Sequence, residues 1–416
     1  MSDALEDLTQ HDILPQTEPA RAPVQGPRIV ALWFSVFALL AGGVFGALYL
    51  SGEGAGSPEE AVQQMFDAIA DEDAIGVFES LAPSERDPYL DNLPKLVDEL
   101  QRLGILGGDA SLSSIKGVDL SFSDLRFTSK SLGEGVSTVT IAGGTARYRV
   151  VPRDLPLGDF VKDIIGEELP AEPQTGSEPV TSDDPDSERI VTVEEDGRWY
   201  VSMHYSLAEA ARLDGGAPVP TFGKGLQAKG ESTPEKAVEA LLRAGVALDV
   251  QRIIELLPPD EGKALRDYAP LFIDDAKQAA GESGFKASIT SLDLEADRSG
   301  GHAVVQAKRF AVAFEMTDFS GTIAFDGKCV TVDGPDIPPN EGRFCPEDQD
   351  APAVITDLAA RMPASGFVAV EHDGSWYVSP TRTLLESVVT VFKTLHRSDL
   401  DALRDFFLDA EGITVG

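Results

Sequence analysis

A long internal repeat constrains the fold of this chain more than any other feature. Three motifs recur at an offset of 176 or 177 positions: 57–62 and 233–238 (SPEEAV, TPEKAV), 81–83 and 257–259 (LAP, LPP), and 196–202 and 373–379 (DGRWYVS, DGSWYVS). Two blocks of about 150 residues that keep one spacing almost to their ends predict a duplicated domain.

An uncharged segment precedes the repeat. Residues 29–50 contain no charged side chain, and 22 residues at ~1.5 Å each span a hydrocarbon core of ~30 Å. Arg21 and Arg28 precede this segment and acidic residues follow it, so the positive-inside rule places 1–28 in the cytoplasm and the repeat outside the cell. The alternative is a cleaved signal peptide, because small residues follow at 52–56.

The composition is strongly acidic, with 70 Asp and Glu against 34 Lys and Arg and a formal net charge of −36. Such a chain is repelled by nucleic acid and by anionic head groups, so a nucleic-acid partner is excluded. Hydrophobic residues make up 42% of the chain, which is enough for packed cores.

The two cysteines, Cys329 and Cys345, both lie in the second copy. Because disulfides persist outside the cell, we expect these two to pair, with the bridge contributing ~3 kcal/mol. The alternative is two free thiols. A metal pair is disfavoured, since no histidine lies between or beside them.

Each copy shows a helical pattern followed by a strand-like pattern. Ser57 and Thr233 are typical helix caps, each followed by proline, and both Asp-Gly turns lie between strand-like runs. This order predicts an α+β domain with helices on one face of a curved antiparallel sheet. We therefore predict a disordered tail (1–28), a transmembrane helix (29–50), a first domain (57–214), a linker (215–231) and a second domain (232–410).

Two further stretches lie outside the parts that the copies share most clearly. The acidic, proline-rich stretch 170–188 is interpreted as an inserted loop. After the second hairpin, Leu384 to about Leu408 is expected to be helical, with Ser398 capping its last part. Its apolar surface either packs on the second domain or docks a partner helix.

The order of elements resembles the cone-shaped domains of the nuclear-transport-factor-2-like (NTF2-like), or cystatin-like, superfamily. The residues that carry the resemblance are 57–62, 71–73, 81–83 and 197–201, with their counterparts in the second copy. Together with one membrane anchor, the hairpin motif looks like that of actinobacterial cell-envelope proteins. The resemblance implies a concave sheet that often forms a pocket, used by some members for catalysis and by many for binding, so it does not settle the function.

The most prominent side chains are the aromatic pairs of the two hairpins, Trp199-Tyr200 and Trp376-Tyr377. Since successive residues of a strand face opposite sides, one ring of each pair should fill the core and the other should face outward or toward a groove. Packing is the favoured role, and recognition of a ligand is the alternative.

Catalytic and metal-binding patterns are weak in this sequence. The histidines at positions 11, 204, 302, 372 and 396 show no ligand spacing, and the acid clusters at 183–188 and 347–350 lack the calcium-loop pattern. No nucleotide-binding loop or nucleophile motif is present. We therefore expect no cofactor, no metal and no catalytic residue.

The sequence as a whole predicts a non-catalytic, single-pass protein of the bacterial cell membrane, with its C-terminal part outside. It would bind or scaffold an envelope protein. The first alternative is a small apolar ligand or lipid in the concave sheet, and the second is an enzyme. An enclosed apolar cavity of a few hundred Å³ would favour the small ligand.

Overall fold

The computed structural model describes residues 54–108, 110, 116–165, 169–180, 189–316, 319–335, 337–338, 341–345, 357–358, 361 and 366–410. The predicted cytoplasmic tail and the predicted membrane-spanning segment lie outside these residues. In the part of the chain that is described, no helix combines the length and the apolar character needed to cross a bilayer.

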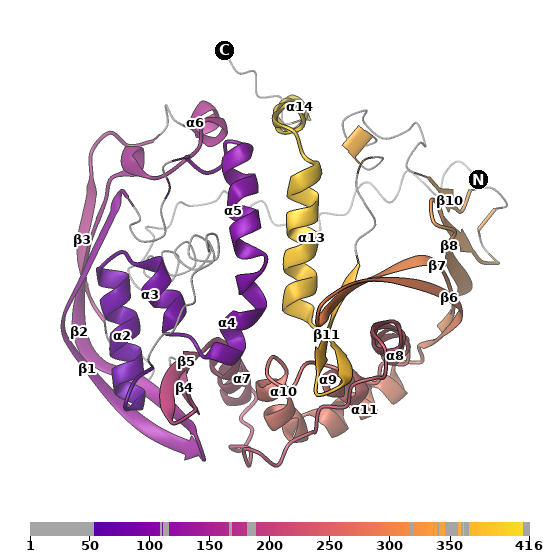
Figure 1. Ribbon diagram of the computed structural model, residues 1–416, viewed down its shortest axis with the longest axis horizontal. Coiled ribbons are helices and arrows are strands. Elements are labelled where there is room, and N and C mark those ends of the chain that lie inside the picture. Colours follow the sequence, from indigo (N-terminus) through magenta and orange to yellow (C-terminus); the bar gives the residue numbers. More distant parts are fainter. Residues whose placement is uncertain are drawn as a thin grey trace, which may run out of the picture. The chain divides into compact units, whose positions relative to one another are not determined.

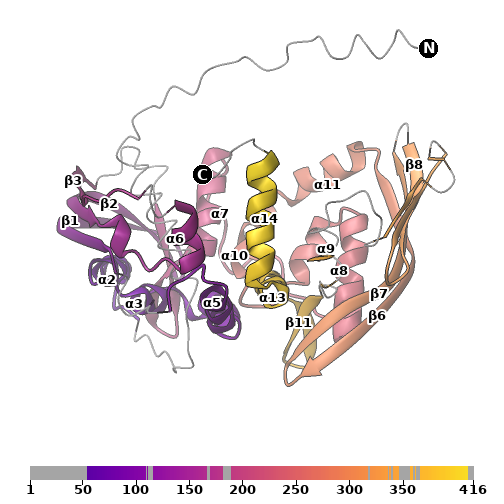
Figure 2. The same cartoon turned by 90° about the horizontal axis from the view of Figure 1, so that it is seen from above.

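Two sets of helices and strands follow one another, and each begins with α-helices, continues with a long pair of strands, and later has a short hairpin followed by a helix (Figures 1 and 2). The elements between the long strand pair and the hairpin differ between the sets. The first set is α2 (Pro58–Ala70), α3 (Ala74–Glu79), α4 (Pro83–Leu90), α5 (Leu93–Arg102), β1 (Val118–Gly133), β2 (Val136–Val150), α6 (Asp159–Ile165), β3 (Gln174–Pro179), β4 (Ile190–Glu195), β5 (Arg198–Ser202) and α7 (Met203–Asp214). The second set is α8 (Pro234–Val246), α9 (Val250–Glu255), α10 (Lys263–Tyr268), α11 (Ile273–Glu282), β6 (Lys286–Ser299), β7 (His302–Met316), β8 (Phe319–Phe325), β9 (Val330–Asp333), β10 (Arg343–Phe344), β11 (Phe367–His372), β12 (Ser375–Val378), α13 (Pro380–Thr394) and α14 (Arg397–Ala410).

Each set contains one curled antiparallel sheet. The first sheet has the order β1-β2-β4-β5, with β3 also paired to β2, and the second has the order β10-β9-β8-β7-β11-β12, with β6 also paired to β7. The register shifts within the long β1–β2 and β6–β7 pairs mark bulges, which bend the strands. The predicted α+β class with a curved antiparallel sheet is therefore confirmed.

The predicted helix starts and hairpin turns have a clear local cause. Ser57 and Thr233 each accept a hydrogen bond from the backbone N–H three residues later, and the proline that follows suits the first helical position. At the hairpin tips, Asp196 and Asp373 have φ values of 49° and 50° and the following glycines also have positive φ. This backbone matches the type I′ turn that right-twisted strands require.

The cores form where the first helix of each set crosses its sheet. In the first set, the α2 residues Val62, Phe66 and Ile69 pack against Val139 and Val201. In the second set, two α8 residues pack against sheet residues, in a cluster of Ala237, Val238, Ala303, Val305, Ala369, Trp376 and Val378. Burial of such side chains is the main stabilising contribution to each sheet.

A third cluster joins the two sets, which belong to one compact unit. Tyr205 of α7 and Tyr268 of α10 are both buried in it, and their rings lie 6.2 Å apart. The Tyr205 hydroxyl donates to Asp267, and the Tyr268 hydroxyl donates to Glu209 at 2.9 Å. Phe222 of the predicted linker packs on both tyrosines, so this stretch is fixed to the protein at that point.

The contacts between the two sets are reciprocal. Helix α7 of the first set packs on α10 of the second, and α13 of the second packs on α4 and α5 of the first. Helices α7 and α13 follow the two hairpins, and α4 and α10 follow the two Pro motifs, so equivalent elements meet twice. This is the pattern of an interface between two copies related by a two-fold axis.

Two local predictions were wrong. The stretch 170–188 was expected to be a loop, but Gln174–Pro179 forms β3 on the edge of the first sheet. The residues of β3 show no apolar alternation that could have predicted a strand. The strand is held by backbone pairing with β2, which does not require such a pattern. Ser398 was expected to cap the last helix, but α14 begins at Arg397, and Asp399 instead accepts from the backbone N–H of His396 at 2.7 Å.

Candidate functional site

The four hairpin aromatics have packing roles in the structure. Tyr200, Trp376 and Tyr377 are buried. Trp199 is half-buried, and its backbone forms an isolated antiparallel β-bridge with Ala55. The expectation that one ring of each pair faces outward fails in the second hairpin, because both Trp376 and Tyr377 are buried, each in its own cluster. Trp376 packs in the α8 cluster, whereas Tyr377 packs in a separate cluster with Ala228 nearby.

The serine that ends each hairpin motif meets a buried glutamate that lies two residues after the Pro motif, Glu85 in α4 and Glu261 in the turn before α10. Ser202 donates to Glu85, and the Glu85 carboxylate also accepts from the backbone N–H of Met203 at 2.7 Å. In the second set, Ser379 donates to Glu261 at 2.6 Å and the Thr381 N–H donates to the same carboxylate at 2.7 Å. This glutamate–serine network fixes the first turn of α7 and of α13.

Burial has an electrostatic consequence at Glu85, whose side chain is almost inaccessible to water. Desolvation raises the pKa of the Glu85 carboxyl, and nearby His204 and the hydrogen bonds to the carboxylate oppose the rise. The carboxylate is surrounded by donors and its partner Ser202 is fully buried, so no substrate can reach the pair. The network positions a helix and offers no reaction site.

The remaining titratable residues do not form a metal centre. His302 lies 3.9 Å from Asp91 and His372 lies 3.4 Å from Asp373, and both histidines line one hollow of about 150 Å³ together with Arg382. Across the described residues, no group of three or more His, Cys, Asp or Glu side chains is placed to hold a metal ion. The acid clusters 183–188 and 347–350 and His11 lie outside those residues.

The far half of the second sheet carries an apolar face, which we call the phenylalanine face. The cross-strand register places its members on one side of the sheet. They are Ala287, Ile289, Leu292, Phe310, Val312, Phe314, Met316, Phe319, Ile323, Phe325, Val330, Val332 and Phe344. None is a fully buried core residue, and Met316 and Phe344 are 50% and 59% exposed.

The first sheet differs at this point. There, Phe66 of α2 packs between Phe122, at 5.0 Å, and Phe127, at 5.8 Å, and so closes the face with a helix side chain. In the second sheet the phenylalanines contact one another, Phe310 with Phe325 at 5.7 Å and Phe314 with Phe319 at 5.5 Å. On the phenylalanine face, the rings of neighbouring strands therefore contact one another, whereas in the first sheet the equivalent contact is made by a phenylalanine of helix α2.

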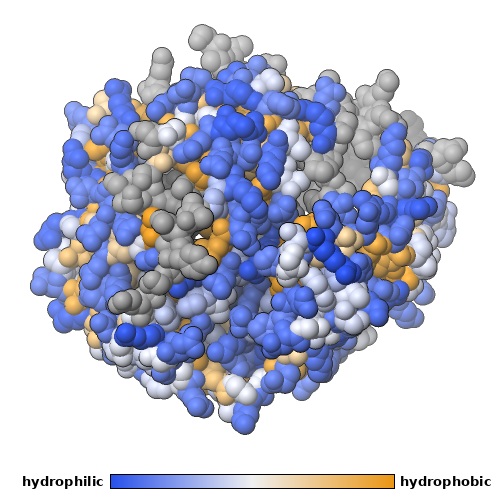
Figure 3. Space-filling model, viewed as in Figure 1, coloured by the Kyte–Doolittle hydropathy of each residue, from blue (hydrophilic) through white to orange (hydrophobic). Residues whose placement is uncertain are grey.

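A hollow of about 860 Å³ lies at the end of the phenylalanine face. Phe314, Met316 and Phe319 supply its apolar lining, and Lys286 and Glu315, which face each other across β6 and β7, supply charge. The hollow is open to solvent on a broad side. The outer surface seen in Figure 3 is mostly hydrophilic with scattered hydrophobic patches.

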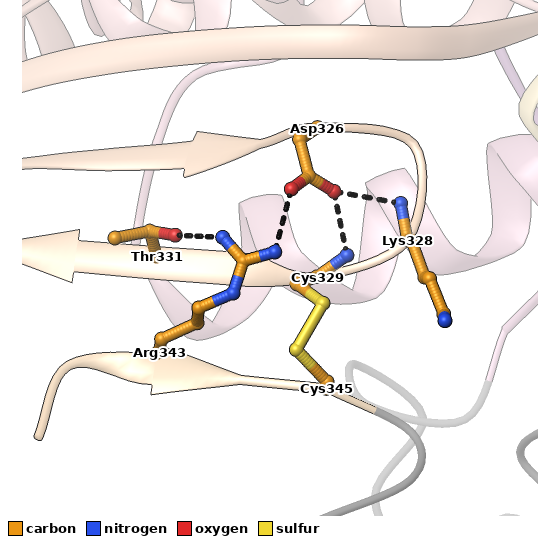
Figure 4. The surroundings of a disulfide bond; sticks show 6 residues. All are labelled: Asp326, Lys328, Cys329, Thr331, Arg343 and Cys345. Carbon is orange, nitrogen blue, oxygen red and sulfur yellow. Dashed lines mark hydrogen bonds and ion pairs between the residues drawn. A yellow bond between two sulfur atoms is a disulfide. The ribbon is translucent and has the colours of Figure 1, made fainter. Parts of the chain in front are cut away.

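A disulfide fixes the edge of the same face (Figure 4). Cys329 and Cys345 are bonded, with 4.4 Å between their Cα atoms, and tie β9 to β10. The bond agrees with the pairing expected from the sequence. Asp326 accepts from the backbone N–H of Cys329 at 2.8 Å and from Arg343 at 2.9 Å, and these donors lower the pKa of Asp326 to about 2. The edge that carries Phe344 is thus held in one conformation.

Phe314, Met316 and Phe319 give the hollow an apolar part, and serine, threonine and charged side chains line the rest, so it could hold a group that is partly apolar and partly polar. Sequence reasoning did not find this face, because the face depends on the register of five strands, β6 to β10. Glu85 and Glu261 were also missed. The sequence signal that could have found them is that a glutamate stands two residues after the proline in both copies, after Pro83 and after Pro259.

Comparison with known proteins adds little to this geometry. No protein-family model matches the chain, and no curated protein matches it. One solved structure, an "Ntf2 like protein involved in plasmid conjugation", aligns with 77% of this chain and 95% of its own length at 10% sequence identity. The TM-score of 0.16 is too low for this likeness to support an argument about the fold.

Proposed function

We propose that the protein is a membrane-anchored binding or scaffolding protein of the bacterial cell envelope, built from two NTF2-like domains in tandem. Residues 29–50 would be the anchor, and both sheets would lie outside the cell. The repeated motifs and the recurring order of helices and strands support the tandem interpretation. The uncharged segment and the arginines before it support the topology.

One observation carries the binding role: among the described residues, the ring contacts of the phenylalanine face lie within the sheet, whereas Phe66 of α2 contacts the rings of the first sheet. Aromatic and methionine side chains are the residue types enriched at the centres of protein interfaces. The disulfide next to the face keeps its edge in place before a partner arrives, which lowers the entropic cost of binding. We therefore place the binding site for an envelope protein on this face.

A small apolar ligand or lipid is the second candidate, supported by Phe314, Met316 and Phe319, which line part of the hollow. Small-molecule sites bury ~70–90% of their ligand. Because the hollow at Phe314 is open on a broad side, its shape suits a protruding side chain of a protein better than an engulfed molecule. An enzyme is the third candidate, and it would require activated groups within ~3 Å of a reacting atom.

The test uses a charge placed on the face. The full ectodomain is immobilised and exposed to envelope extract, in wild-type form and as Met316→Asp and Phe344→Asp variants. Ser291→Asp is the matched control, because Ser291 is an exposed residue of β6 outside the phenylalanine face. A protein retained by the wild type and the control but reduced at least ~10-fold by both face variants is the expected result.

Two results would contradict the proposal. Equal retention by all four proteins would show that the face is not the binding site. Saturable binding of a fatty acid or lipid, lost in the Met316→Asp variant and without any protein retained, would promote the second candidate.

A further inference from the structure

The interface between the repeats has two equivalent sides, because matching elements meet twice across it. One side is the tyrosine cluster, which includes Ala82, Val136, Val193, Tyr205 and Ala264. The other side is the hollow of about 150 Å³ that contains both histidines, and its lining includes the five equivalent residues, Pro258, His302, Val370, Arg382 and Pro88. We call this second side the polar side.

The equivalence of these residues follows from the sequence and from the sheets. Four of the five pairs keep the offset of 176 or 177 positions between the copies. The fifth pair is given by the strand register, since Val136 pairs with Val193 in the first sheet and His302 pairs with Val370 in the second. The hollow is therefore the counterpart of the tyrosine cluster.

Two replacements distinguish the polar side from the tyrosine cluster. Tyr205 and Val136 are each 4% exposed in the cluster, where their burial stabilises the interface. On the polar side, Arg382 stands in place of the tyrosine and His302 in place of the valine. Arg382 is half-buried, and the side chain of His302 is 46% exposed. One side is thus closed by apolar packing, and the other carries two basic residues beside a hollow.

The contacts across the polar side are long. A ring nitrogen of His302 lies 3.9 Å from a carboxylate oxygen of Asp91, which follows α4 in the first repeat. Arg382 of α13 donates to the backbone carbonyl of Asp87 at 3.3 Å. In the tyrosine cluster, by comparison, the Tyr268 hydroxyl donates across the repeats at 2.9 Å. The polar side is therefore the more weakly joined of the two.

The surroundings of His302 disfavour a proton on its ring. Partial burial lowers the pKa of His302, the Arg382 guanidinium lowers it further, and Asp91 opposes both effects. The Nε of Arg382 is buried and has no hydrogen-bond partner among the described residues. The other titratable groups that line the hollow are Asp87, Asp260, Glu261, Glu371 and His372. A protonated His302 would therefore lie close to a cation that is only partly compensated.

The pH dependence that results has a definite sign. When the polar side opens, His302 returns to water, where its usual pKa is 6.5. The contribution of His302 to the closed state is complete above pH 6.5 and is lost as the pH falls through the lowered pKa. Burial raises the pKa of Asp87 above its usual value of 3.8, so Asp87 opposes this effect at more acidic pH. Acidification just below neutral pH therefore favours opening.

We propose that the polar side of the repeat interface is a pH-sensitive contact, which is closed at neutral pH and opens when His302 takes up a proton. The tyrosine cluster keeps the repeats joined on the other side during this change. Opening exposes Val370 and the hollow to solvent. The proposal does not depend on the phenylalanine face, which lies on the far half of the second sheet.

The test compares two buried positions that are equivalent in the repeats, in the full-length protein. Val370→Cys places a thiol on the polar side, and Val193→Cys places one in the tyrosine cluster as the matched control; the two valines are 8% and 3% exposed. Dithiodipyridine modifies thiols in acid as well as at neutral pH. Its rate with each folded variant is divided by its rate with the same variant in denaturant, at several values between about pH 8 and about pH 5.

A second measurement predicts the size of the effect. Histidine-selective NMR of the full-length protein gives the pKa of His302, with His302→Gln used to assign its signal. Each unit by which this pKa lies below 6.5 should increase the relative rate of Val370→Cys by up to ~10-fold at the acid limit. The relative rate of Val193→Cys should change less than ~2-fold over the same range, because the tyrosine cluster stays closed.

Further substitutions in the Val370→Cys protein identify the group that titrates. His302→Gln should remove the increase in acid, and so should His302→Val, which restores the residue type of the equivalent position. Arg382→Met should raise the pKa of His302 and reduce the increase. His372→Gln is the matched control, because His372 lines the same hollow, and it should leave the increase unchanged.

Four outcomes would overturn the proposal. The first is a pKa of 6.5 or higher for His302 in the folded protein. The second is a relative rate of Val370→Cys that does not change with pH. The third is an equal increase in Val193→Cys, which would indicate loosening of the whole protein. The fourth is an increase that persists in both His302→Gln and His302→Val, which would assign the titration to another group.

Discussion

Replacing Glu85 by alanine tests the connection between the Pro motif and the hairpin motif. Glu85 is 3% exposed and accepts hydrogen bonds from the Ser202 hydroxyl and the Met203 backbone N–H. In the Glu85→Ala variant both donors lose their partner inside the protein. A buried donor without a partner costs ~1–3 kcal/mol, so the free energy of unfolding should fall by about 3 kcal/mol.

Two effects adjust this magnitude. Removing a buried carboxylate also removes its desolvation cost, which reduces the loss at neutral pH. Ser202 still caps α7, because its hydroxyl oxygen accepts from the Tyr205 N–H at 3.0 Å in either variant. We therefore expect 2–4 kcal/mol, on the order of two donors at ~1–2 kcal/mol each. At ~2 °C per kcal/mol for a large domain, the melting temperature should fall by about 5 °C.

The pH dependence of Glu85→Gln gives an independent check with a definite sign. Burial raises the pKa of the Glu85 carboxyl above its usual value of 4.5, so between the usual and the raised pKa the folded protein binds more protons than the unfolded chain. The stability from protonated Glu85 is complete below about pH 4.5 and is lost as the pH rises through the raised pKa. Glutamine does not titrate, so the advantage of the wild type over Glu85→Gln should shrink across that window.

Urea unfolding at a series of pH values measures both quantities. Glu261→Ala is the matched variant in the second repeat, because Glu261 accepts from Ser379 and Thr381 in the same way. Glu134→Ala, at an exposed loop tip, is the control and should change stability by less than ~0.5 kcal/mol. A loss below ~0.5 kcal/mol in Glu85→Ala, or a wild-type advantage over Glu85→Gln that grows with pH, would refute the reasoning.

Four further predictions follow from the same observations. Protease added to intact cells should remove both sheets and spare the tail before the 29–50 segment, and protection of the sheets would exclude the proposed topology. Denatured, non-reduced protein should show no free thiol, and replacing Cys329 and Cys345 by serine should destabilise the second sheet by ~3 kcal/mol. A pH titration of Asp326 followed by carbon-detected NMR should give a pKa of about 2 for its carboxylate. A pKa near the usual value of 3.8 would show that the hydrogen bonds donated to this carboxylate are not formed in solution. Cutting the gene at Gly216 should give two halves that do not melt cooperatively alone, because the cut divides the tyrosine cluster.

Local signals made much of the fold predictable from the sequence. The caps at Ser57 and Thr233 and the Asp-Gly turns depend on residues within four positions of each other, and the structure contains all of them. Strand β3 was not predictable in this way, because Gln174–Pro179 has no apolar alternation and is held by its neighbour. The same limit applies to any element whose stability comes from backbone pairing across the sheet.

The candidate sites were less predictable, because they depend on contacts across long stretches of chain. Glu85 and Ser202 are separated by 117 positions, so neither residue alone indicates the bond between them. The phenylalanine face requires the register of strands β6 to β10, which a bulge near Ile289 shifts. A one-residue error in that register would move every side chain to the other side of the sheet.

The shared tyrosine cluster changes what the repeat means for function. Two domains joined by a free linker would hold their surfaces at variable distances, and each would bind with its own affinity. Here Tyr205 donates to Asp267 across the repeats, and the Gly223 N–H of the linker donates to the same carboxylate at 3.0 Å. The linker is therefore part of the interface, and the two repeats behave as one body with a fixed geometry. If Glu85→Ala and Glu261→Ala each lower a single common unfolding transition, this coupling holds. Two separate transitions would show that the repeats unfold independently and that the tyrosine cluster does not couple them.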